Sequence, residues 1–423
     1  MTQTDHQNVP KLRFPGFEGD WDHVRIQELV DASIIISQMD GNHGELYPRS
    51  EEFAEEGVPY ISANDFRLGK VDFGRSKKLP QARADSFKKG ISKSGDLLFA
   101  HNATVGPTAI LETDLDFVIL STTVTYYRFD EEKFSTNFAY HAFNTKDFIR
   151  QYSRVMSQST RNQVPITTQR KFFLPKPSLP EQRKIADFLG AVDTKIAQLA
   201  EKKRLLEDYK KGCMQQLFSQ KIRFKDDDGN DFPDWEEKRL GEIFEEITDK
   251  VGVQKLPTYS ISAGKGWISQ EEKFGKDISG QQNARYTALQ IGDFSYNKGN
   301  SKTYKYGCVY PNDTGKVIAV PNVFISFRPN SNDISGGFYA KLFENHFLDR
   351  GLRQLISSGA RMDGLLNINK GEFFKLIVPR PHPDEQRKIA DFLSALDRKI
   401  DLVGQELTHA RSFKQGLLQQ MFV

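Results

Sequence analysis

The sequence predicts an α+β fold made of two related halves, each a mixed α/β body followed by one long helix. The segment EQRKIADFL occurs at residues 181–189 and returns at 385–393, which is 204 residues further on (385 − 181). Each copy opens a stretch with helical apolar spacing. Prolines crowd before each stretch and are absent inside it, as expected at helix starts. They are Pro175, Pro177 and Pro180, and Pro379, Pro381 and Pro383.

Composition places the chain among ordinary globular proteins. Its 423 residues suggest two or three domains, and 27% charged with 38% hydrophobic residues is typical of soluble proteins. The net charge of +3 neither requires nor excludes a nucleic-acid partner. Cys213 and Cys308 are too few for a zinc site or a disulfide framework. No segment approaches the roughly 18 apolar residues of a membrane span. We therefore expect a soluble, cytoplasmic protein with no membrane partner.

The repeat extends beyond the nine shared residues. Pairing 181–218 with 385–422 gives 18 identities in 38 positions without a gap. More weakly, 12–29 resembles 222–243, with Trp21/Trp235, Arg25/Arg239 and Glu28/Glu242 aligned. Further matched landmarks are Tyr60–Ala63 with Ser260–Ala263, Gly95-Asp96 with Gly292-Asp293, Phe172-Phe173 with Phe373-Phe374, and Pro175–Pro177 with Pro379–Pro381. The predicted domains are a body at 1–180, a helix at 181–220, a body at 221–384 and a helix at 385–423.

Each predicted helix carries one apolar seam of coiled-coil type, with steps of three and four residues. The seam residues are Ile185, Leu189, Val192, Ile196, Leu199 and Leu206 in the first helix, and Ile389, Leu393, Leu396, Ile400, Val403 and Leu417 in the second. A segment of about 38 residues spans roughly 57 Å at ~1.5 Å per residue. Lys203, Lys210 and Lys414 interrupt the seams and would set register.

A long helix with one apolar stripe needs a partner for it, and two packings are open. Each helix packs on its own body, or the two helices pack on each other. In the second case the first helix leads from body one to body two and the second departs from body two. We predict this second packing, in which the two helices form an antiparallel coiled coil and the halves are related by a pseudo-two-fold axis.

These features together resemble the specificity subunit of type I restriction–modification enzymes, and the resemblance covers essentially the whole chain. It rests on the duplicated P-x-P…EQRKIA-x-FL helix, on an RFP…W…LGEI-like lead, and on GDLLFAHNATVG at 95–106. The second body departs from this pattern with GDFSYNKGNSKTYKYG at 292–307.

The resemblance implies that each body is a target recognition domain that reads one half of a bipartite, asymmetric DNA target. The paired helices would set the gap between the half-sites. They would also dock two methyltransferase subunits, which engage the endonuclease/translocase subunits. S-adenosylmethionine, ATP and Mg²⁺ would belong to those partners, and this chain would bind no cofactor. Two unlike bodies on one pseudo-symmetric frame also suit half-sites about one helical turn apart, ~34–36 Å.

Signals of catalysis are absent from the sequence. No G-x-x-x-x-G-K-[ST] occurs, and Gly275-Lys276-Asp277 lacks both the upstream glycine and the hydroxyl. No Asn/Asp-Pro-Pro-aromatic stretch is present, and eight histidines are scattered without metal-ligand spacing. FPDWEEKR at 232–239 offers nuclease-like residues at the wrong spacing, so we interpret it as a surface lead-in. We predict no catalytic residue and no metal site, and we expect His101 to be a polar loop residue.

Candidate DNA contacts are polar and basic side chains in matched stretches of the two bodies, because such groups read base edges and hold phosphates. In the first body they are Ser62, Asn64, Arg67, Arg75, Lys77, Lys78, His101, Asn102, Thr104, Arg161, Asn162 and Gln163. In the second body they are Lys265, Trp267, Arg285, Tyr286, Asn297, Lys298, Asn300, Lys302, Tyr304, Lys305, Arg328 and Arg361. The alternative for any one of them is a solvated loop.

The start of each long helix calls for a different interpretation. Glu181-Gln182-Arg183-Lys184 and its copy are predicted to be helix-start structure or partner-docking surface, since glutamate in a first turn suits the helix dipole. For the whole chain, the sequence predicts a non-catalytic DNA-recognition subunit. A two-domain protein scaffold that binds no DNA is the alternative, and a stand-alone nuclease or methyltransferase is disfavoured by the missing motifs.

Overall fold

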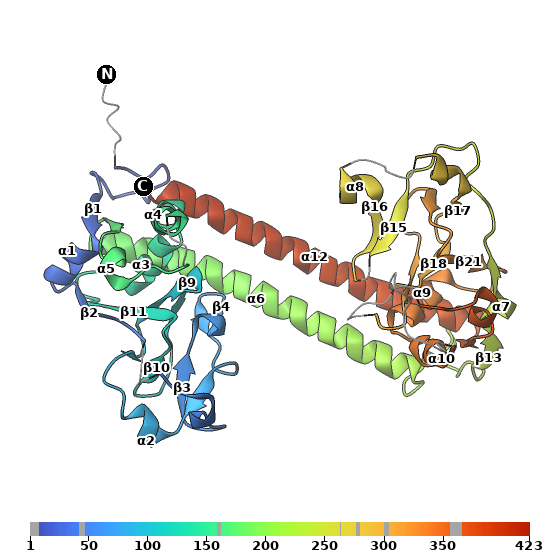
Figure 1. The fold of residues 1–423 in the computed structure, drawn as a ribbon, viewed down its shortest axis with the longest axis horizontal. Helices are drawn as coiled ribbons and strands as arrows, with labels where there is room; N and C mark the ends of the chain where they lie inside the picture. The colour runs from blue at the N-terminus through green and yellow to red at the C-terminus, as the bar shows by residue number, and fades with distance from the viewer. Residues whose placement is uncertain are drawn as a thin grey trace. The chain divides into compact units, whose positions relative to one another are not determined.

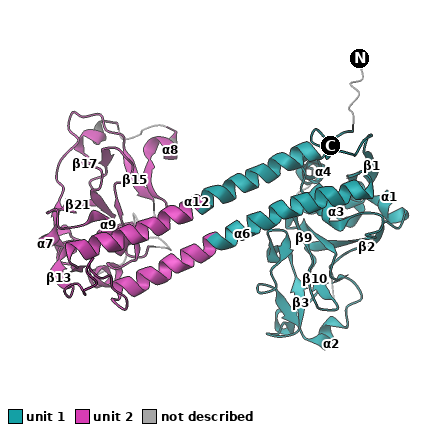
Figure 2. Cartoon of the chain, turned by 180° about the vertical axis from the view of Figure 1, so that it is seen from behind, with its two compact units in different colours: residues 1–202, 403–423 teal, residues 203–402 magenta. Residues whose placement is uncertain are grey.

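A computed structural model describes residues 8–41, 47–158, 162–262, 264–275, 280–299, 304–355 and 366–423. The chain divides into two compact units, shown in Figure 2. Unit 1 comprises residues 1–202 and 403–423, and unit 2 comprises 203–402. The long helices are α6 (Leu179–Phe218) and α12 (Pro383–Met421) (Figure 1). Each unit therefore combines one body with part of both long helices.

Unit 1 holds a six-stranded sheet, a four-stranded sheet and a two-stranded sheet, in the orders β2-β11-β8-β9-β5-β4, β6-β3-β10-β7 and β1-β12. Its strands are β1 (Asp22–Arg25), β2 (Ile35–Asp40), β3 (Val58–Ile61), β4 (Phe66–Arg67), β5 (Lys70–Val71), β6 (Lys77–Leu79), β7 (Ile91–Ser92), β8 (Leu97–Asn102), β9 (Thr104–Ile110), β10 (Val118–Leu120), β11 (Val124–Phe129) and β12 (Phe173–Lys176). Its short helices are α1 (Ile26–Asp31), η2 (Ser50–Glu52), η3 (Ala63–Asp65), α2 (Gln81–Ala84), α3 (Thr136–Phe143), α4 (Lys146–Ser157) and α5 (Ile166–Gln169).

Unit 2 repeats this plan with smaller sheets, in the orders β14-β21-β18-β19, β15-β16, β17-β20 and β13-β22. Its strands are β13 (Glu236–Arg239), β14 (Phe244–Glu246), β15 (Tyr259–Ser262), β16 (Gly266–Ser269), β17 (Thr287–Leu289), β18 (Phe294–Asn297), β19 (Cys308–Pro311), β20 (Ile318–Val320), β21 (Ile325–Pro329) and β22 (Ile377–Arg380). Its short helices are α7 (Leu240–Ile243), α8 (Gln270–Phe274), η4 (Gly280–Arg285), α9 (Gly336–Glu344), α10 (Asp349–Leu355) and α11 (Lys370–Phe373).

The lead of each body pairs with the strand that precedes its long helix. Arg25 of β1 lies opposite Phe173 of β12, and Arg239 of β13 lies opposite Ile377 of β22. Phe173 therefore corresponds to Ile377. The sequence-based pairing of Phe172-Phe173 with Phe373-Phe374 is wrong, because strand register decides the match and a Phe-Phe pair by itself does not.

The repeated Glu-Gln at the helix start is buried structure in both units. In unit 1, Arg13 donates from Nε and Nη2 to the Glu181 carboxylate at 2.7 and 2.8 Å. Gln182 accepts from the Ser135 backbone N–H at 3.0 Å and so ties the start of α6 to the start of α3. Glutamine thus satisfies a buried backbone donor, and glutamate holds the lead with a charge-assisted pair.

Unit 2 contains the same arrangement with an added donor. Arg223 donates to both oxygens of Glu385 at 3.1 and 2.8 Å, and the Trp235 indole N–H adds a third bond at 2.9 Å. Gln386 accepts from the Ser335 N–H at 2.9 Å. The repeated motif was predicted to be either helix-start structure or a partner-docking surface. Its first two residues, Glu181-Gln182 and Glu385-Gln386, are helix-start structure.

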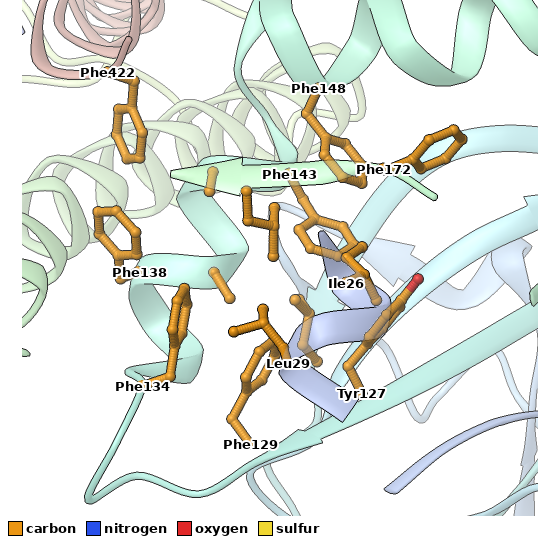
Figure 3. Packing of buried hydrophobic residues seen from close by; sticks show 14 of the residues in the cluster. Ile26, Leu29, Tyr127, Phe129, Phe134, Phe138, Phe143, Phe148, Phe172 and Phe422 are labelled. Carbon is orange, nitrogen blue, oxygen red and sulfur yellow. The ribbon is translucent and has the colours of Figure 1, made fainter. Parts of the chain in front are cut away.

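The core of unit 1 is rich in phenylalanine and includes the end of α12 (Figure 3). Phe138 and Phe422 stack with centroids 5.2 Å apart, and Trp21 meets Phe422 edge-on at 6.0 Å. Leu417, Leu418 and Met421 are buried in the same cluster. The core of unit 2 likewise takes in Met214, Leu217 and Phe218 from the end of α6. Apolar burial in each body thus depends on a distant stretch of chain.

The long helices run antiparallel where they meet, and a lysine–aspartate pair joins them in each unit. In unit 1, Lys414 of α12 contacts both oxygens of Asp193 of α6 at 2.6 and 2.7 Å. In unit 2, Lys210 contacts Asp397. The two pairs are equivalent under the 204-residue repeat (193 + 204 and 210 + 204). The predicted fold class, two mixed α/β bodies each followed by a long helix with the helices antiparallel, is confirmed.

Most residues of the predicted seam are buried, and those nearest each body belong to its core, such as Ile185 and Leu189 in unit 1 and Ile389 and Leu393 in unit 2. Ile185, Leu189, Ile196, Leu199, Ile389, Leu393, Ile400, Val403 and Leu417 are buried, and Val192, Leu206 and Leu396 are half-buried. Lys210 and Lys414, which interrupt the apolar pattern, supply the cross-helix ion pairs. Within the described residues, no helix is both long and apolar enough to cross a membrane. In the same part of the chain, no cluster of His, Cys, Asp and Glu could hold a metal ion.

Candidate nucleic-acid interface

The hairpin of β8 and β9 ends in a one-residue turn that presents polar side chains. Asn102 and Thr104 lie opposite each other, and Ala103 between them has φ of 62°. A non-glycine residue rarely adopts this conformation, and such strain is concentrated at functional sites. The Ala103 N–H donates to the Asn162 carbonyl at 2.9 Å, which holds the turn in place.

Three predicted stretches of unit 1 meet around the loop 121–123. The Ala63 N–H donates to Thr123 Oγ1 at 3.0 Å, and the His101 N–H donates to the Thr123 carbonyl at 3.0 Å. Val164 N–H donates to the His101 carbonyl at 2.8 Å. We call residues 62–67, 101–104, 121–123 and 162–164 the unit 1 loop cluster. It brings together Ser62, Asn64, Asn102, Thr104, Asn162 and Gln163, whereas Arg67, at the end of the first stretch, lies on β4 and lines a groove beside α6 and α3.

Three further basic residues of unit 1 lie on or beside β6. Lys77 lies opposite Tyr60, two residues before Ser62, and its ammonium is 4.6 Å from the Phe53 ring centre. Lys78 is half-buried opposite Pro59, and Arg75 is exposed in the turn before the strand. These side chains flank the unit 1 loop cluster and do not join its hydrogen bonds.

The prediction that His101 is a loop residue is wrong. His101 belongs to β8 and is 1% exposed, so its ring is not presented to solvent even though its backbone organises the unit 1 loop cluster. Residues Leu97 to His101 of β8 are all buried, and only Asn102 at the end of the strand is half-buried, so His101 lies inside the unit with the rest of the strand. Arg161, another predicted contact, lies outside the described residues.

Unit 2 uses the same framework with different residues. Leu366 N–H donates to the Lys298 carbonyl at 2.9 Å, as Val164 does to His101. Asn297 donates to the Ile261 carbonyl at 3.0 Å, and Lys298 Nζ donates to the Ile368 carbonyl at 2.8 Å. Where unit 1 turns in one residue, β18 and β19 are separated by residues 298–307. The departure seen in the sequence is therefore a longer connection between the two strands, of which residues 300–303 lie outside the described residues.

The unit 2 loop cluster consists of residues 261–262, 264–267, 297–299, 304–310 and 366–368. Lys265 is exposed in the β15–β16 turn, and Trp267 donates its indole N–H to the Pro311 carbonyl at 2.7 Å. Tyr304 stacks on His346 with centroids 4.9 Å apart, and Lys305 is exposed beside it. This cluster therefore joins exposed ammonium groups to aromatic rings, a combination suited to phosphates and bases.

The remaining predicted residues of unit 2 are placed elsewhere or lie outside the description. Arg285 and Tyr286 adjoin residues 251–252, where the Val251 N–H donates to the Tyr286 carbonyl at 3.0 Å. Asn300, Lys302 and Arg361 lie outside the described residues. Arg328 is half-buried and contacts Asp293 at 3.1 Å.

The Arg328–Asp293 pair has a counterpart beneath the first hairpin. Arg128 donates from Nε and Nη2 to Asp96 at 2.7 Å each, and this bond raises the pKa of Arg128. Burial raises the pKa of Asp293, and Arg328 opposes that rise. These pairs anchor the turn that precedes β8 and the turn that precedes β18. Each pair therefore holds the start of a hairpin strand, at the opposite end from the loop that is available to a ligand.

Sequence reasoning missed Ser121, Thr122 and Thr123, on which the unit 1 loop cluster is assembled. A signal was available, because this polar triplet directly follows the buried strand β10. Polar residues at the end of a buried strand are typical of site-forming loops.

A second surface lies on the long helices, where the repeat keeps identical residues at exposed positions. These are Arg183/Arg387, Asp187/Asp391, Ala191/Ala395, Lys195/Lys399, Gln215/Gln419 and Gln216/Gln420. Added Cβ atoms at Gly212 and Gly416 would meet nothing within 4 Å. By contrast, 197–209 and 401–413 share no identity. Packing does not explain identity at solvent-facing positions. These positions therefore suit one kind of partner that binds equivalent residues on each of the two long helices.

Comparison with known proteins agrees with this architecture. The chain is 23% identical to the putative type I restriction enzyme MjaX specificity subunit of Methanocaldococcus jannaschii, over 97% of this chain and 95% of the relative. It is 25% identical to the MjaVIII specificity subunit of the same organism, over 52% of this chain and about half (51%) of that relative. The crystal structure of the type I restriction-modification S subunit from M. genitalium superposes with a TM-score of 0.57, at 17% identity, covering 98% and 99% of the two chains.

The family described as the type I restriction modification DNA specificity domain matches residues 18–208 and 233–410. Those two regions take in both bodies and most of both long helices. The chain belongs to the family of type I restriction–modification DNA specificity proteins and carries the family's domain twice.

Proposed function

We propose that this chain is a non-catalytic specificity subunit in which each unit reads one half of a bipartite, asymmetric DNA target. The observation that carries the proposal is the pair of loop clusters. Both clusters contain the equivalent backbone hydrogen bond, which the Val164 N–H donates to the His101 carbonyl in unit 1 and the Leu366 N–H donates to the Lys298 carbonyl in unit 2. They nevertheless present Asn102, Thr104 and Asn162 in one unit and Lys265, Tyr304 and Lys305 in the other. A bipartite DNA target with two different half-sites requires different base-contacting side chains on the same backbone framework.

The paired helices are proposed to set the gap between half-sites and to dock two copies of one methyltransferase subunit, which engage endonuclease subunits. The identical exposed residues at both helix ends support this docking, because two copies of one partner would need the same contacts twice. S-adenosylmethionine, ATP and Mg²⁺ are assigned to those partners. We place the complex in the cytoplasm, where the free thiols of Cys213 and Cys308 persist.

Exchanging one body should exchange one half of the target. Replacing residues 222–384 with the matching segment of a relative is expected to change one half-site in the methylated sequence and leave the other intact. The reason is that each loop cluster is held by bonds within its own unit. Methylome sequencing of cells that carry the chimera and its methyltransferase measures this. A change in both halves, or in neither, contradicts the modular assignment.

Exposed lysines of the unit 2 loop cluster should act on phosphates. The double change Lys265→Ala and Lys305→Ala is expected to weaken binding to all sequences alike and to flatten the salt dependence. Each lost phosphate contact lowers the slope of log K against log[salt] by about 0.9. Fluorescence anisotropy between 50 and 200 mM salt measures the slope.

The matched control for this pair is Lys375→Ala, an exposed lysine of unit 2 outside the loop cluster that pairs with Glu372 at 2.6 Å. It should leave the slope unchanged. If the wild-type chain shows no salt-dependent affinity for DNA, the two-domain protein scaffold becomes the better description.

A further inference from the structure

A groove in unit 1 lies between α6, α3 and the turn that joins β4 to β5. Its volume is about 610 Å³. Small residues of α6 form one wall, namely Ala186, Gly190 and Ala197, and Leu68 and Tyr140 stand on the other side. An added Cβ on Gly190 would meet nothing within 4 Å. The helix backbone is therefore open to close approach from within the groove.

His141 and Asp193 both line this groove, and Lys414 donates to both oxygens of Asp193. His141 is 2% exposed, and its Nδ1 has no hydrogen-bond partner within the described residues. This nitrogen lies 3.9 Å from Asp193 Oδ2. Burial, aided by Lys414, lowers the pKa of His141 to about 3, so the ring is neutral. Its N–H bonds the Ala186 backbone, which leaves Nδ1 as the acceptor.

A buried acceptor with no donor costs about 1–3 kcal/mol, so Nδ1 calls for a donor from outside the chain. That donor must also suit the carboxylate of Asp193. A cationic N–H group satisfies both atoms at once.

Unit 2 shows what this position accepts. Ser135 caps α3 and Ser335 caps α9, so Lys341 occupies the place of His141, six residues after each cap. Lys341 and Lys210 contact the two oxygens of Asp397, the counterpart of Asp193. Glu344 balances the added charge through contacts with both lysines. In unit 1, among described residues, Lys414 is the one ammonium on Asp193.

We propose that this groove receives a lysine or arginine side chain of a protein partner, whose cationic N–H donates to His141 Nδ1 and to Asp193. The groove lining holds the carboxylate of Asp187 to balance the added charge, and it also includes Arg67 and Lys70, the latter paired with Glu112 at 2.6 Å. Asp187 also belongs to the exposed positions repeated on both helices, so the groove continues the surface proposed for docking. The inference rests on the proposed function in that the partner is the methyltransferase subunit.

Two substitutions test the groove from different directions. His141→Lys places an internal ammonium where Lys341 stands in unit 2, and Gly190→Trp fills the groove from an open helix position. Each is expected to weaken binding of one of the two methyltransferase copies at least tenfold, as measured by calorimetry and by native mass spectrometry of the full-length chain. The control is Leu205→Trp, an α6 residue 52% exposed in the stretch that lacks repeated identities, which should bind both copies normally.

Unchanged DNA affinity of the variants, measured alone, shows that unit 1 remains folded. If wild type binds the methyltransferase subunit and both variants bind it equally well, the inference is overturned while the proposed docking stands. If Gly190→Trp loses binding and His141→Lys binds normally, the groove is a docking site but its occupant is not a cationic side chain. If wild type binds no methyltransferase subunit, the proposed docking fails, and the inference fails with it.

Discussion

Deleting the last ten residues, 414–423, is expected to unfold unit 1 while unit 2 stays folded. The deletion removes Leu417, Leu418, Met421 and Phe422 from the core of unit 1. Burying a side chain of this size contributes about 1.5–3 kcal/mol, so four of them contribute roughly 6–12 kcal/mol. That sum is comparable with the whole stability of a domain, about 5–15 kcal/mol. Lys414 is lost as well, which leaves Asp193 without its cross-helix partner.

Hydrogen exchange with mass spectrometry separates the two units in one sample. Peptides from β8 should lose protection, and peptides from β18 should keep it. The single change Phe422→Ala should destabilise unit 1 by about 3–5 kcal/mol, as for other buried phenylalanines. Phe413→Ala, on the same helix but 58% exposed, should stay within about 0.5 kcal/mol of wild type. Full protection of β8 in the truncated chain would contradict the shared core.

Replacing Arg223 with alanine is expected to destabilise unit 2 by about 3–5 kcal/mol, because it leaves a buried carboxylate without its charge partner. Glu385 is fully buried and accepts two bonds from this guanidinium. For a unit of this size, each kcal/mol lowers Tm by about 2–4 °C, so the loss is roughly 6–20 °C. Differential scanning calorimetry measures it.

The equivalent change in unit 1 sharpens this test. Arg13→Ala should cost at least as much, because Glu385 would keep the Trp235 N–H, whereas Trp21 Nε1 has no hydrogen-bond partner within the described residues. The control is Arg387→Ala, which breaks an exposed pair with Asp384 and should cost about 1 kcal/mol or less. Losses at Arg13 and Arg223 no larger than this control would mean that the buried pairs are not stabilising.

Local pattern carried much of the fold prediction. Helical spacing and flanking prolines are short-range features, and together with the gap-free repeat they predicted both long helices and their antiparallel pairing. Even the interruptions were informative, since Lys210 and Lys414 became the ion pairs that join the helices. The alignment of Phe172 failed because residue type was used where strand register decides.

The candidate interface was predictable as a set of stretches and much less as individual side chains. Polar, basic composition pointed to the loops around Asn64, Asn102 and Asn162. It gave no way to tell that His101 turns inward or that Arg328 is held by Asp293. Which side of a strand a residue faces depends on pairing with segments far away in sequence, and composition does not report it.

By itself, the sequence determined that one frame occurs twice, that a long helix closes each copy, and that the contents of the two bodies differ. Periodicity over a few turns suffices for that, because helix formation and amphipathic burial are local. Only the tertiary structure decided that each body completes its core with the far end of the other helix. It also decided that Glu181 and Glu385 are buried acceptors and that four separated loops of unit 1 meet around Thr123. Those outcomes depend on burial and hydrogen-bond satisfaction between segments as far as 408 residues apart (420 − 12), as in the bond from the Leu12 N–H to the Gln420 carbonyl.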